Sequence, residues 1–209
     1  MNNEKIEKDQ LEILFEDGAV YKGPIDEQSN APSGFGSLDF PESSKYLRFE
    51  GKFLRGKMVD GTLTCRNGDS YKGALDNDLQ FEGEGVFECQ KNTFSGNFTN
   101  GVLSEGKVKY QNGDSYTGKL SQFVPHGQGV MLYDSGDKYT GEFKEGSKSG
   151  KGTYESKVNG YRYEGEFSRD QPCGSGKIFK EGTILEGYFY EGELEGDYSI
   201  TTNTVIKKK

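Results

Sequence analysis

The sequence is poor in the residues on which catalysis, metal binding and disulfide frameworks depend. Its 209 residues include one histidine, three cysteines, five prolines and no tryptophan. Three widely spaced cysteines without a Cys-x-x-Cys pair indicate reduced thiols and argue against a disulfide framework or a zinc site. The single histidine, His126, has no partner nucleophile or acid that the sequence specifies. We therefore expect no catalytic residues, no bound metal and no cofactor.

Long apolar stretches are also missing. Hydrophobic residues make up 31% of the chain, and no segment approaches the roughly 20 apolar residues that a membrane span requires. Residues 1–10 are polar and lack the apolar core of a secretory signal. The net charge of −8 repels phosphate backbones and anionic headgroups, which argues against nucleic acid and membrane surfaces as partners. These absences predict a cytoplasmic protein.

Glycine and aromatic residues are what the chain has in excess. It contains 31 glycines, 13 tyrosines and 14 phenylalanines. A disordered chain would have few aromatic residues. Rings and glycines combined with a low aliphatic content indicate a thin folded structure with much surface and no thick core.

A short unit, aromatic-x-Gly, recurs along the chain at a nearly constant spacing. Seven copies begin with Tyr or Phe, and an eighth begins with Leu185. The copies begin at residues 21, 49, 71, 94, 116, 139, 163 and 185. Successive starts lie 22–24 residues apart, except for a first interval of 28 that holds an insertion around Pro41–Lys45. A fixed period of this length is the signature of a repeat architecture.

Each period also contains a second unit, Gly-x-Gly-x-apolar, of which residues 150–154 are an example. Two copies depart from this unit. In one, Leu63 follows Gly61 at the place of the second glycine, and in the other, Val108 follows Gly106. We expect the inner face of these two repeats to be more filled than that of the others.

Both units alternate apolar or glycine positions with polar ones, which is the period of a β-strand and not of a helix. Asn-Gly pairs such as Asn159-Gly160 precede several copies and are strong hairpin signals, because tight primed turns need positive φ angles. Glycine weakens a strand, so we expect a neighbouring ring to lie flat across the bare backbone and compensate. The sequence predicts an all-β fold, an elongated, twisted single-layer antiparallel sheet of tandem β-hairpin repeats.

The ends of such a sheet need caps, because open edge strands invite pairing with another chain. Leu11, Ile13 and Phe15 are expected to cap the N-terminal edge, and Tyr198 and Ile200 the C-terminal edge. The expected organisation is a polar tail at residues 1–10, about eight repeats over 11–201 with a half-hairpin cap at 11–18, and a basic tail at 202–209.

The combination of aromatic-x-Gly-x-Phe, a glycine-bearing loop, Gly-x-Gly and an Asn-Gly or Asp-Gly turn resembles the MORN repeat family. Residues 139–153 and 163–167 are the closest copies, and the resemblance extends over residues 11–201. The chain departs from the family in having Phe at several positions where Trp is common. The resemblance implies a single-layer sheet with a groove lined by Tyr and Phe, in scaffolds of cytoskeletal assemblies, membrane junctions and cilia, including radial spokes.

An exposed apolar groove marks an interaction site, and aromatic rings recognise proteins with little loss of entropy. We expect an amphipathic helix or an extended segment of a partner protein to lie there. Replacing Tyr139 or Tyr163 with alanine should then abolish partner binding without unfolding the chain. The residues predicted to line this groove are Tyr71, Phe94, Tyr116, Tyr139, Phe143, Tyr154, Tyr163 and Phe167.

The sequence therefore predicts a non-catalytic scaffold or adaptor, not an enzyme, that is part of a larger protein complex. The resemblance places it in the cytoplasm and cytoskeleton, or in the cilium and its axoneme, for example in a radial spoke. Two alternatives stay open. One is a membrane- or phospholipid-associated adaptor, and the other is an accessory subunit of an enzyme.

Overall fold

The computed structural model describes residues 11–202, and within this range the regular elements are strands, without a helix. The chain divides into two compact units, Met1–Leu103 and Ser104–Lys209. The tail predicted at residues 1–10, and all but the first residue of the tail predicted at 202–209, lie outside the described residues.

Unit 1 is a series of antiparallel strands. Its strands are β1 (Leu11–Leu14), β2 (Val20–Gly23), β3 (Ile25–Asp26), β4 (Ala31–Pro32), β5 (Gly34–Asp39), β6 (Tyr46–Leu54), β7 (Lys57–Cys65), β8 (Ser70–Leu75), β9 (Phe81–Cys89) and β10 (Asn92–Phe98). Each strand pairs with the next along the chain, except that β2 pairs with β5 and the short hairpin β3–β4 stands apart. The insertion predicted around residues 41–45 lies in the loop between β5 and β6.

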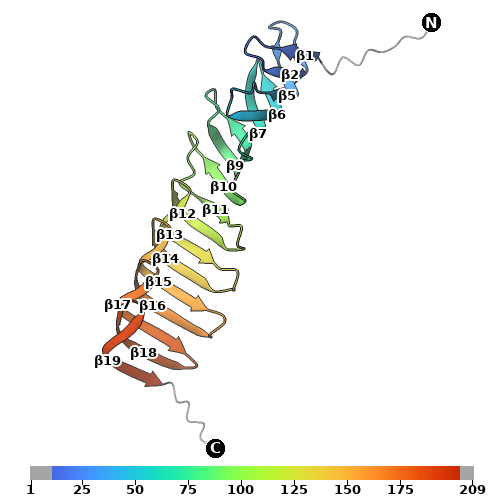
Figure 1. Cartoon of the computed structure of the whole chain (residues 1–209). Helices are drawn as coiled ribbons and strands as arrows, with labels where there is room; N and C mark the ends of the chain where they lie inside the picture. The colour runs from blue at the N-terminus through green and yellow to red at the C-terminus, as the bar shows by residue number, and fades with distance from the viewer. Residues whose placement is uncertain (1–10, 203–209) are drawn as a thin grey trace, which may run out of the picture. The chain divides into compact units, whose positions relative to one another are not determined.

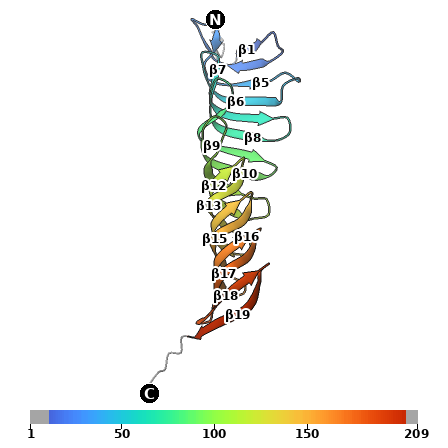
Figure 2. The ribbon, with the colours of Figure 1, turned by 90° about the vertical axis from the view of Figure 1, so that its left-hand side faces the viewer.

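Unit 2 repeats the same arrangement without interruption. Its strands are β11 (Glu105–Lys109), β12 (Ser115–Ser121), β13 (Val124–Leu132), β14 (Lys138–Lys144), β15 (Ser147–Ser156), β16 (Tyr161–Ser168), β17 (Gln171–Lys180), β18 (Thr183–Tyr190) and β19 (Glu193–Thr202). Each pairs antiparallel with its neighbours in sequence. Figures 1 and 2 show these strands side by side in chain order, with no second layer of structure covering them.

The predicted all-β fold of consecutive antiparallel hairpins is confirmed, and the sheet is not closed into a barrel. The positions of the tight turns differ, however, from the prediction that they lie at the Asn-Gly pairs. Primed two-residue turns, with positive φ at both positions, occur at Glu145-Gly146 and at Arg169-Asp170. The Asn67-Gly68 pair lies instead in a longer loop, where only the glycine has a positive φ. There the Asn67 side chain accepts a hydrogen bond from the backbone N–H of Asp69 at 3.1 Å.

A continuous row of glycines crosses each unit at right angles to the strands. In unit 1 the pairing register joins Gly36, Gly51, Gly61, Gly73, Gly85 and Gly96. In unit 2 it joins Gly106, Gly118, Gly129, Gly141, Gly152, Gly165, Gly176 and Gly187. The two faces of the sheet differ along this row. On one face, which we call the ring face, tyrosine and phenylalanine side chains pack on the bare backbone of the glycines. The opposite side, the polar face, carries the alternating polar residues of each strand.

The two glycines of each Gly-x-Gly unit have different tasks. The first adopts the left-handed backbone conformation, as at Gly150 (φ +59°), which residues with a Cβ rarely adopt. The strand pairing shifts by two residues at this point, since Gly141 of the preceding strand pairs with Gly152 whereas Glu142 pairs with Ser149, which is a β-bulge. The second glycine, Gly152, leaves room for the ring of Tyr139. The first glycine therefore bends the strand, and the second admits the ring.

This division of tasks corrects the prediction for the two irregular repeats. Gly61 pairs with Gly51 and Gly73, so it occupies the second glycine position and not the first. The residue that replaces the first glycine is Val59, and Leu63 is the ordinary apolar position that follows. The same holds for Gly106, which pairs with Gly118. These two repeats therefore keep the space for the ring but lack the first glycine with its left-handed conformation.

Candidate interaction surface

The residues predicted to line an aromatic groove lie on the ring face, but most of them are closed off from solvent. Seven of the eight are buried, and Tyr154 is half-buried. The expectation that one side of the stripe stays open is wrong for these seven rings. Their predicted role in partner binding is a separate matter and stays a prediction. The buried residues are Tyr71, Phe94, Tyr116, Tyr139, Phe143, Tyr163 and Phe167.

Tyr139 shows how a ring is enclosed. Its exposed fraction is 0%. Phe143 of its own strand meets its ring edge-on at 5.1 Å between centroids, and Phe167 of the next repeat does so at 4.9 Å. A Cβ added at Gly141 would lie 2.6 Å from the tyrosine hydroxyl oxygen, so the ring lies directly against the glycine row. The expected cover of glycine by aromatic rings is confirmed here, and each tyrosine is held jointly by two repeats.

Lys148 closes the remaining side of this ring cluster. Its Nζ lies 5.1 Å from the ring centroid of Tyr154, 5.6 Å from that of Tyr133 and 5.9 Å from that of Tyr139. An ammonium group over ring faces is attracted by their electron density, and its aliphatic stem excludes water. Tyr154 itself donates a hydrogen bond of 2.7 Å to the Asp137 carboxylate. The ring cluster is therefore a packed core.

Each buried tyrosine hydroxyl is anchored to the backbone. Tyr139 donates to the carbonyl oxygen of Glu142 at 3.0 Å, and Tyr163 donates to that of Glu166 at 3.2 Å. Burial raises the pKa of the Tyr163 and Tyr116 hydroxyls to about 12, because the tyrosinate anion would lose its water. Burial raises the pKa of Tyr139 as well.

These raised pKa values predict a loss of stability in alkali. The folded chain holds the tyrosine protons more tightly than the unfolded chain, whose tyrosines have pKa values near 10. The stabilisation is therefore complete below pH 10 and is lost as the pH rises from 10 to about 12. Tyrosinate absorbance should rise in two steps, and the second step should coincide with the loss of strand signal in circular dichroism. A single step near pH 10 with the strands intact would contradict this.

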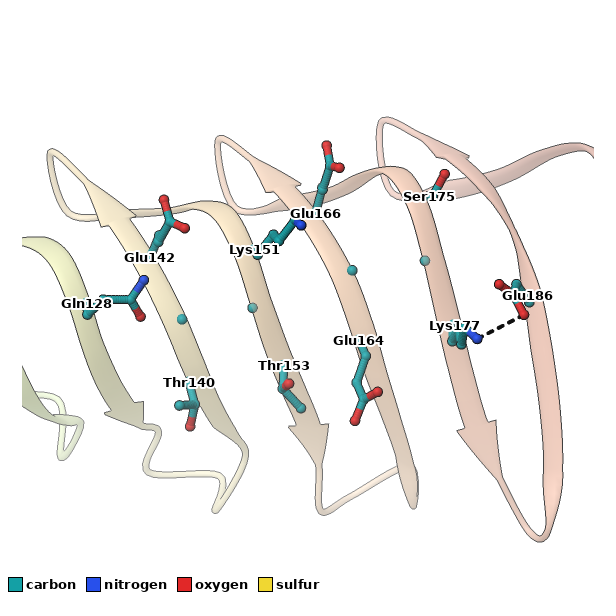
Figure 3. Close-up of a pocket in the computed structure, with 14 residues that line it drawn as sticks. Gln128, Thr140, Glu142, Lys151, Thr153, Glu164, Glu166, Ser175, Lys177 and Glu186 are labelled. Carbon is teal, nitrogen blue, oxygen red and sulfur yellow. Dashed lines mark ion pairs between the residues drawn. The ribbon is translucent and has the colours of Figure 1, made fainter.

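The polar face of unit 2 contains an open groove of about 660 Å³. Four glycines of the row lie among its lining residues, Gly141, Gly152, Gly165 and Gly176. Polar side chains stand on either side of them (Figure 3). On one side, Thr140, Thr153, Glu164, Lys177 and Glu186 are opposite one another in the pairing register of successive strands. On the other side lie Gln128, Glu142, Lys151, Glu166 and Ser175.

The charges in this groove are unevenly compensated. Its lining residues include four carboxylates and two lysines. Lys177 forms a 3.1 Å ion pair with Glu186, and Glu164 forms one of 3.2 Å with Arg162. Within the described residues, the exposed carboxylates of Glu142 and Glu166 have no cation within ion-pair distance. The groove therefore offers free negative charge beside a floor of bare backbone.

Other candidate sites remain without support. His126 is exposed on β13. Cys65, Cys89 and Cys173 are free thiols, and burial raises the pKa of each, which disfavours the reactive thiolate. In residues 11–202, no three His, Cys, Asp or Glu side chains are grouped so that they could hold a metal ion. The same part of the chain has no helix that is long and apolar enough to cross a membrane.

The comparison with known families agrees with the predicted positions of the repeats. The family model of the MORN repeat matches residues 49–70, 124–138, 139–160 and 163–183. These four segments of the chain are similar to the MORN repeat. Three of the four matched segments begin at the predicted repeat starts 49, 139 and 163, so the predicted resemblance is confirmed for these parts. A search of curated proteins finds no match.

MORN repeats are generally modules that interact with proteins or membranes, and the family is generally non-catalytic. The glycine row passes through the matched MORN segments and continues in the same register through unmatched strands, for example from Gly176 on β17 to Gly187 on β18. The sequence prediction missed the polar groove. Its signal was present in the polar residues that flank each glycine, but the alternation alone does not show that these residues line a groove.

Proposed function

We propose that the chain is a non-catalytic scaffold that binds another protein through the groove on the polar face of unit 2. The observation that carries this proposal is the pair of exposed carboxylates, Glu142 and Glu166, beside a floor of glycine backbone. A partner segment can approach this floor closely because no side chain stands on it. The buried rings beneath keep the floor rigid, which lowers the entropy cost of binding.

The partner that fits this groove is an extended protein segment with basic side chains. Arginine and lysine would complement the free carboxylates, while Thr140 and Thr153 offer hydroxyl groups to the partner backbone. The excess of carboxylates disfavours anionic lipid headgroups at the same place. We therefore favour a protein partner over the membrane- or phospholipid-associated adaptor.

The proposal includes the setting that the family resemblance implies, a cytoskeletal or ciliary assembly such as a radial spoke. Proximity labelling and affinity purification of the tagged chain from its native cells, read by mass spectrometry, test this setting. Recovery of axonemal or cytoskeletal proteins would support it. Recovery dominated by membrane proteins, or by one catalytic chain, would contradict it and favour an adaptor at the membrane or an enzyme accessory subunit.

The groove itself is tested by reversing its charge. The double variant Glu142→Lys/Glu166→Lys should lower recovery of the main partner by about tenfold or more, a loss of at least about 1.4 kcal/mol of binding energy. A matched control is Glu145→Lys/Glu181→Lys, which changes the net charge equally in two hairpin loops outside the groove. Equal recovery for both double variants would exclude the groove as the binding surface.

A further inference from the structure

The segment that follows β19 has a composition that complements the polar face of unit 2. β19 ends at Thr202, and the seven residues after it contain Val205 and Ile206 followed by the basic run Lys207–Lys209. Two apolar residues are thus followed directly by three positive charges. The predicted caps Tyr198 and Ile200 lie on the ring face and are 56% and 57% exposed, so they leave this end of the polar face uncovered.

An apolar patch lies on the polar face next to the end of β19. The pairing register sets Thr201 beside Ile184 of β18, and Ile184 beside Phe179 of β17. Both apolar side chains are half-buried. Arg162 stacks on the Phe179 ring, with 4.3 Å between the guanidinium carbon and the ring centroid, and both residues line a hollow of about 650 Å³. Apolar side chains laid over this patch would remove further apolar area from water.

Carboxylates follow this patch at increasing distance from Thr202. The register places Glu186 and Glu164 in the next row of side chains, and Glu166 lies beyond them (Figure 3). For strands about 4.8 Å apart and a rise of about 3.3 Å per residue, these three residues lie about 11, 17 and 22 Å from Thr202. The same geometry places Glu142 about 29 Å away.

The segment is long enough to reach the first three carboxylates and too short to reach the fourth. An extended chain advances at most about 3.3–3.6 Å per residue, so Ile206 reaches about 13 Å from Thr202, Lys207 about 17 Å and Lys209 about 24 Å. Phe179 lies about 10 Å from Thr202 by the strand geometry. The order of the segment, apolar and then basic, therefore matches the order of the surface, apolar and then acidic.

We propose that residues 203–209 fold back along the polar face of unit 2 in the same molecule and occupy the end of the groove nearest β19. The two apolar residues cover the apolar patch, and the three lysines complement the carboxylates beyond it. Glu166, which has no cation within ion-pair distance among the described residues, gains one. Because the segment is short and covalently attached, its effective concentration at the groove is high.

The docked segment competes with the basic partner segment for the same groove. This competition rests on the proposed function, whereas the docking itself rests only on the surface and on the sequence of the segment. A partner must displace the segment, so its apparent affinity is reduced by the fraction of molecules in which the groove is free.

Zero-length carbodiimide crosslinking of the full-length chain tests the docking itself. The reagent joins a lysine amine to a carboxylate that it contacts, and peptide mapping by mass spectrometry identifies both residues. We expect Lys207–Lys209 to be joined to the three carboxylates within reach and not to Glu142. The yield should not depend on protein concentration, because the contact is intramolecular. Absence of these crosslinks, or a yield that rises with concentration, would overturn the proposal.

Two matched double variants test the apolar half of the contact. Val205→Asp/Ile206→Asp keeps the lysines but removes the apolar cover, and should lower the crosslink yield at least about threefold. The control Asn203→Asp/Thr204→Asp introduces the same charge into the same segment and keeps the apolar pair. Equal yields from the two variants would show that the lysines are attracted without the apolar contact, and would overturn the proposed docking.

The competition is measured with a fluorescein-labelled hexa-arginine peptide, whose binding to the full-length chain is followed by fluorescence anisotropy. Replacing each of Lys207–Lys209 with glutamine should tighten binding at least about threefold relative to a control in which Lys5, Lys8 and Lys91 become glutamine. The control has the same net charge and changes only unit 1. Equal affinities would overturn the competition. A peptide affinity that Glu142→Lys leaves unchanged would contradict the proposed groove alone, because the crosslinks decide the docking.

Discussion

Replacing Tyr139 with alanine is expected to lower the free energy of unfolding by about 4 kcal/mol, as is usual for a fully buried aromatic side chain. The ring is 0% exposed and meets Phe143 and Phe167. The change removes the packing of both phenylalanines and the hydroxyl's hydrogen bond to the Glu142 carbonyl. Urea unfolding followed by circular dichroism measures the loss.

A matched control for this prediction is Tyr190→Ala. Tyr190 is 55% exposed, so its replacement should change the unfolding free energy by no more than about 0.5 kcal/mol. Because repeats unfold partly independently, the hairpins next to residue 139 should unfold before the others in the Tyr139→Ala variant. An unchanged unfolding midpoint would contradict the burial of the ring. It would also restore the sequence-based expectation that alanine at Tyr139 leaves the fold intact.

Introducing a single methyl group at Gly152 is expected to destabilise the chain by about 2–3 kcal/mol, the cost of overpacking a core. A Cβ at this position would meet only Tyr139 among its nearest atoms, including the ring carbon Cε2 at 2.5 Å. Gly152 has no positive φ, so the cost of Gly152→Ala is one of space and not of backbone conformation. Urea unfolding of the variant measures it.

The double variant Tyr139→Ala/Gly152→Ala tests whether the clash with the Tyr139 ring causes the destabilisation. With the ring absent, the methyl group finds room, so the double variant should be about 2 kcal/mol more stable than the sum of the single effects predicts. Gly141→Ala is the comparison. Its added Cβ would also meet the backbone of Gly152 at 2.6 Å and of Lys151 at 2.7 Å, which the loss of the ring does not relieve. Additive effects at Gly152 would mean that the ring does not fill this space.

The hairpins and the packing of rings on glycine were predictable because both follow from local chemistry. The alternation of Tyr139, Gly141 and Phe143 assigns them to one face of a strand. The burial of that face was not predictable, because it depends on which residues of other strands lie over it. Phe167 and Lys148 reach Tyr139 from strands β16 and β15. Nothing in the sequence near Tyr139 identifies them.

The polar groove escaped prediction for a related reason. Thr140, Glu142 and Lys151 resemble ordinary solvated strand residues when they are read one at a time. Their convergence depends on the bulge after Gly141 and on the left-handed conformation of Gly150. The sequence shows that glycines are present there, but not which of the two bends the chain. The pairing register of the strands distinguishes the first glycine, Gly150, from the second, Gly152. It also places Gly61 and Gly106 at the second glycine position.

The strict division between the ring face and the polar face has a consequence for how such proteins diversify. Residues such as Thr140, Glu142 and Thr153 contribute little to the core, so substitutions there cost little stability. The sheet can therefore tolerate many different patterns of charge on its polar face, where neighbouring strands lie about 4.8 Å apart. A duplicated repeat would add two strands and lengthen the surface without disturbing the packing rules. Evolution can thus alter what the surface recognises while leaving the architecture unchanged.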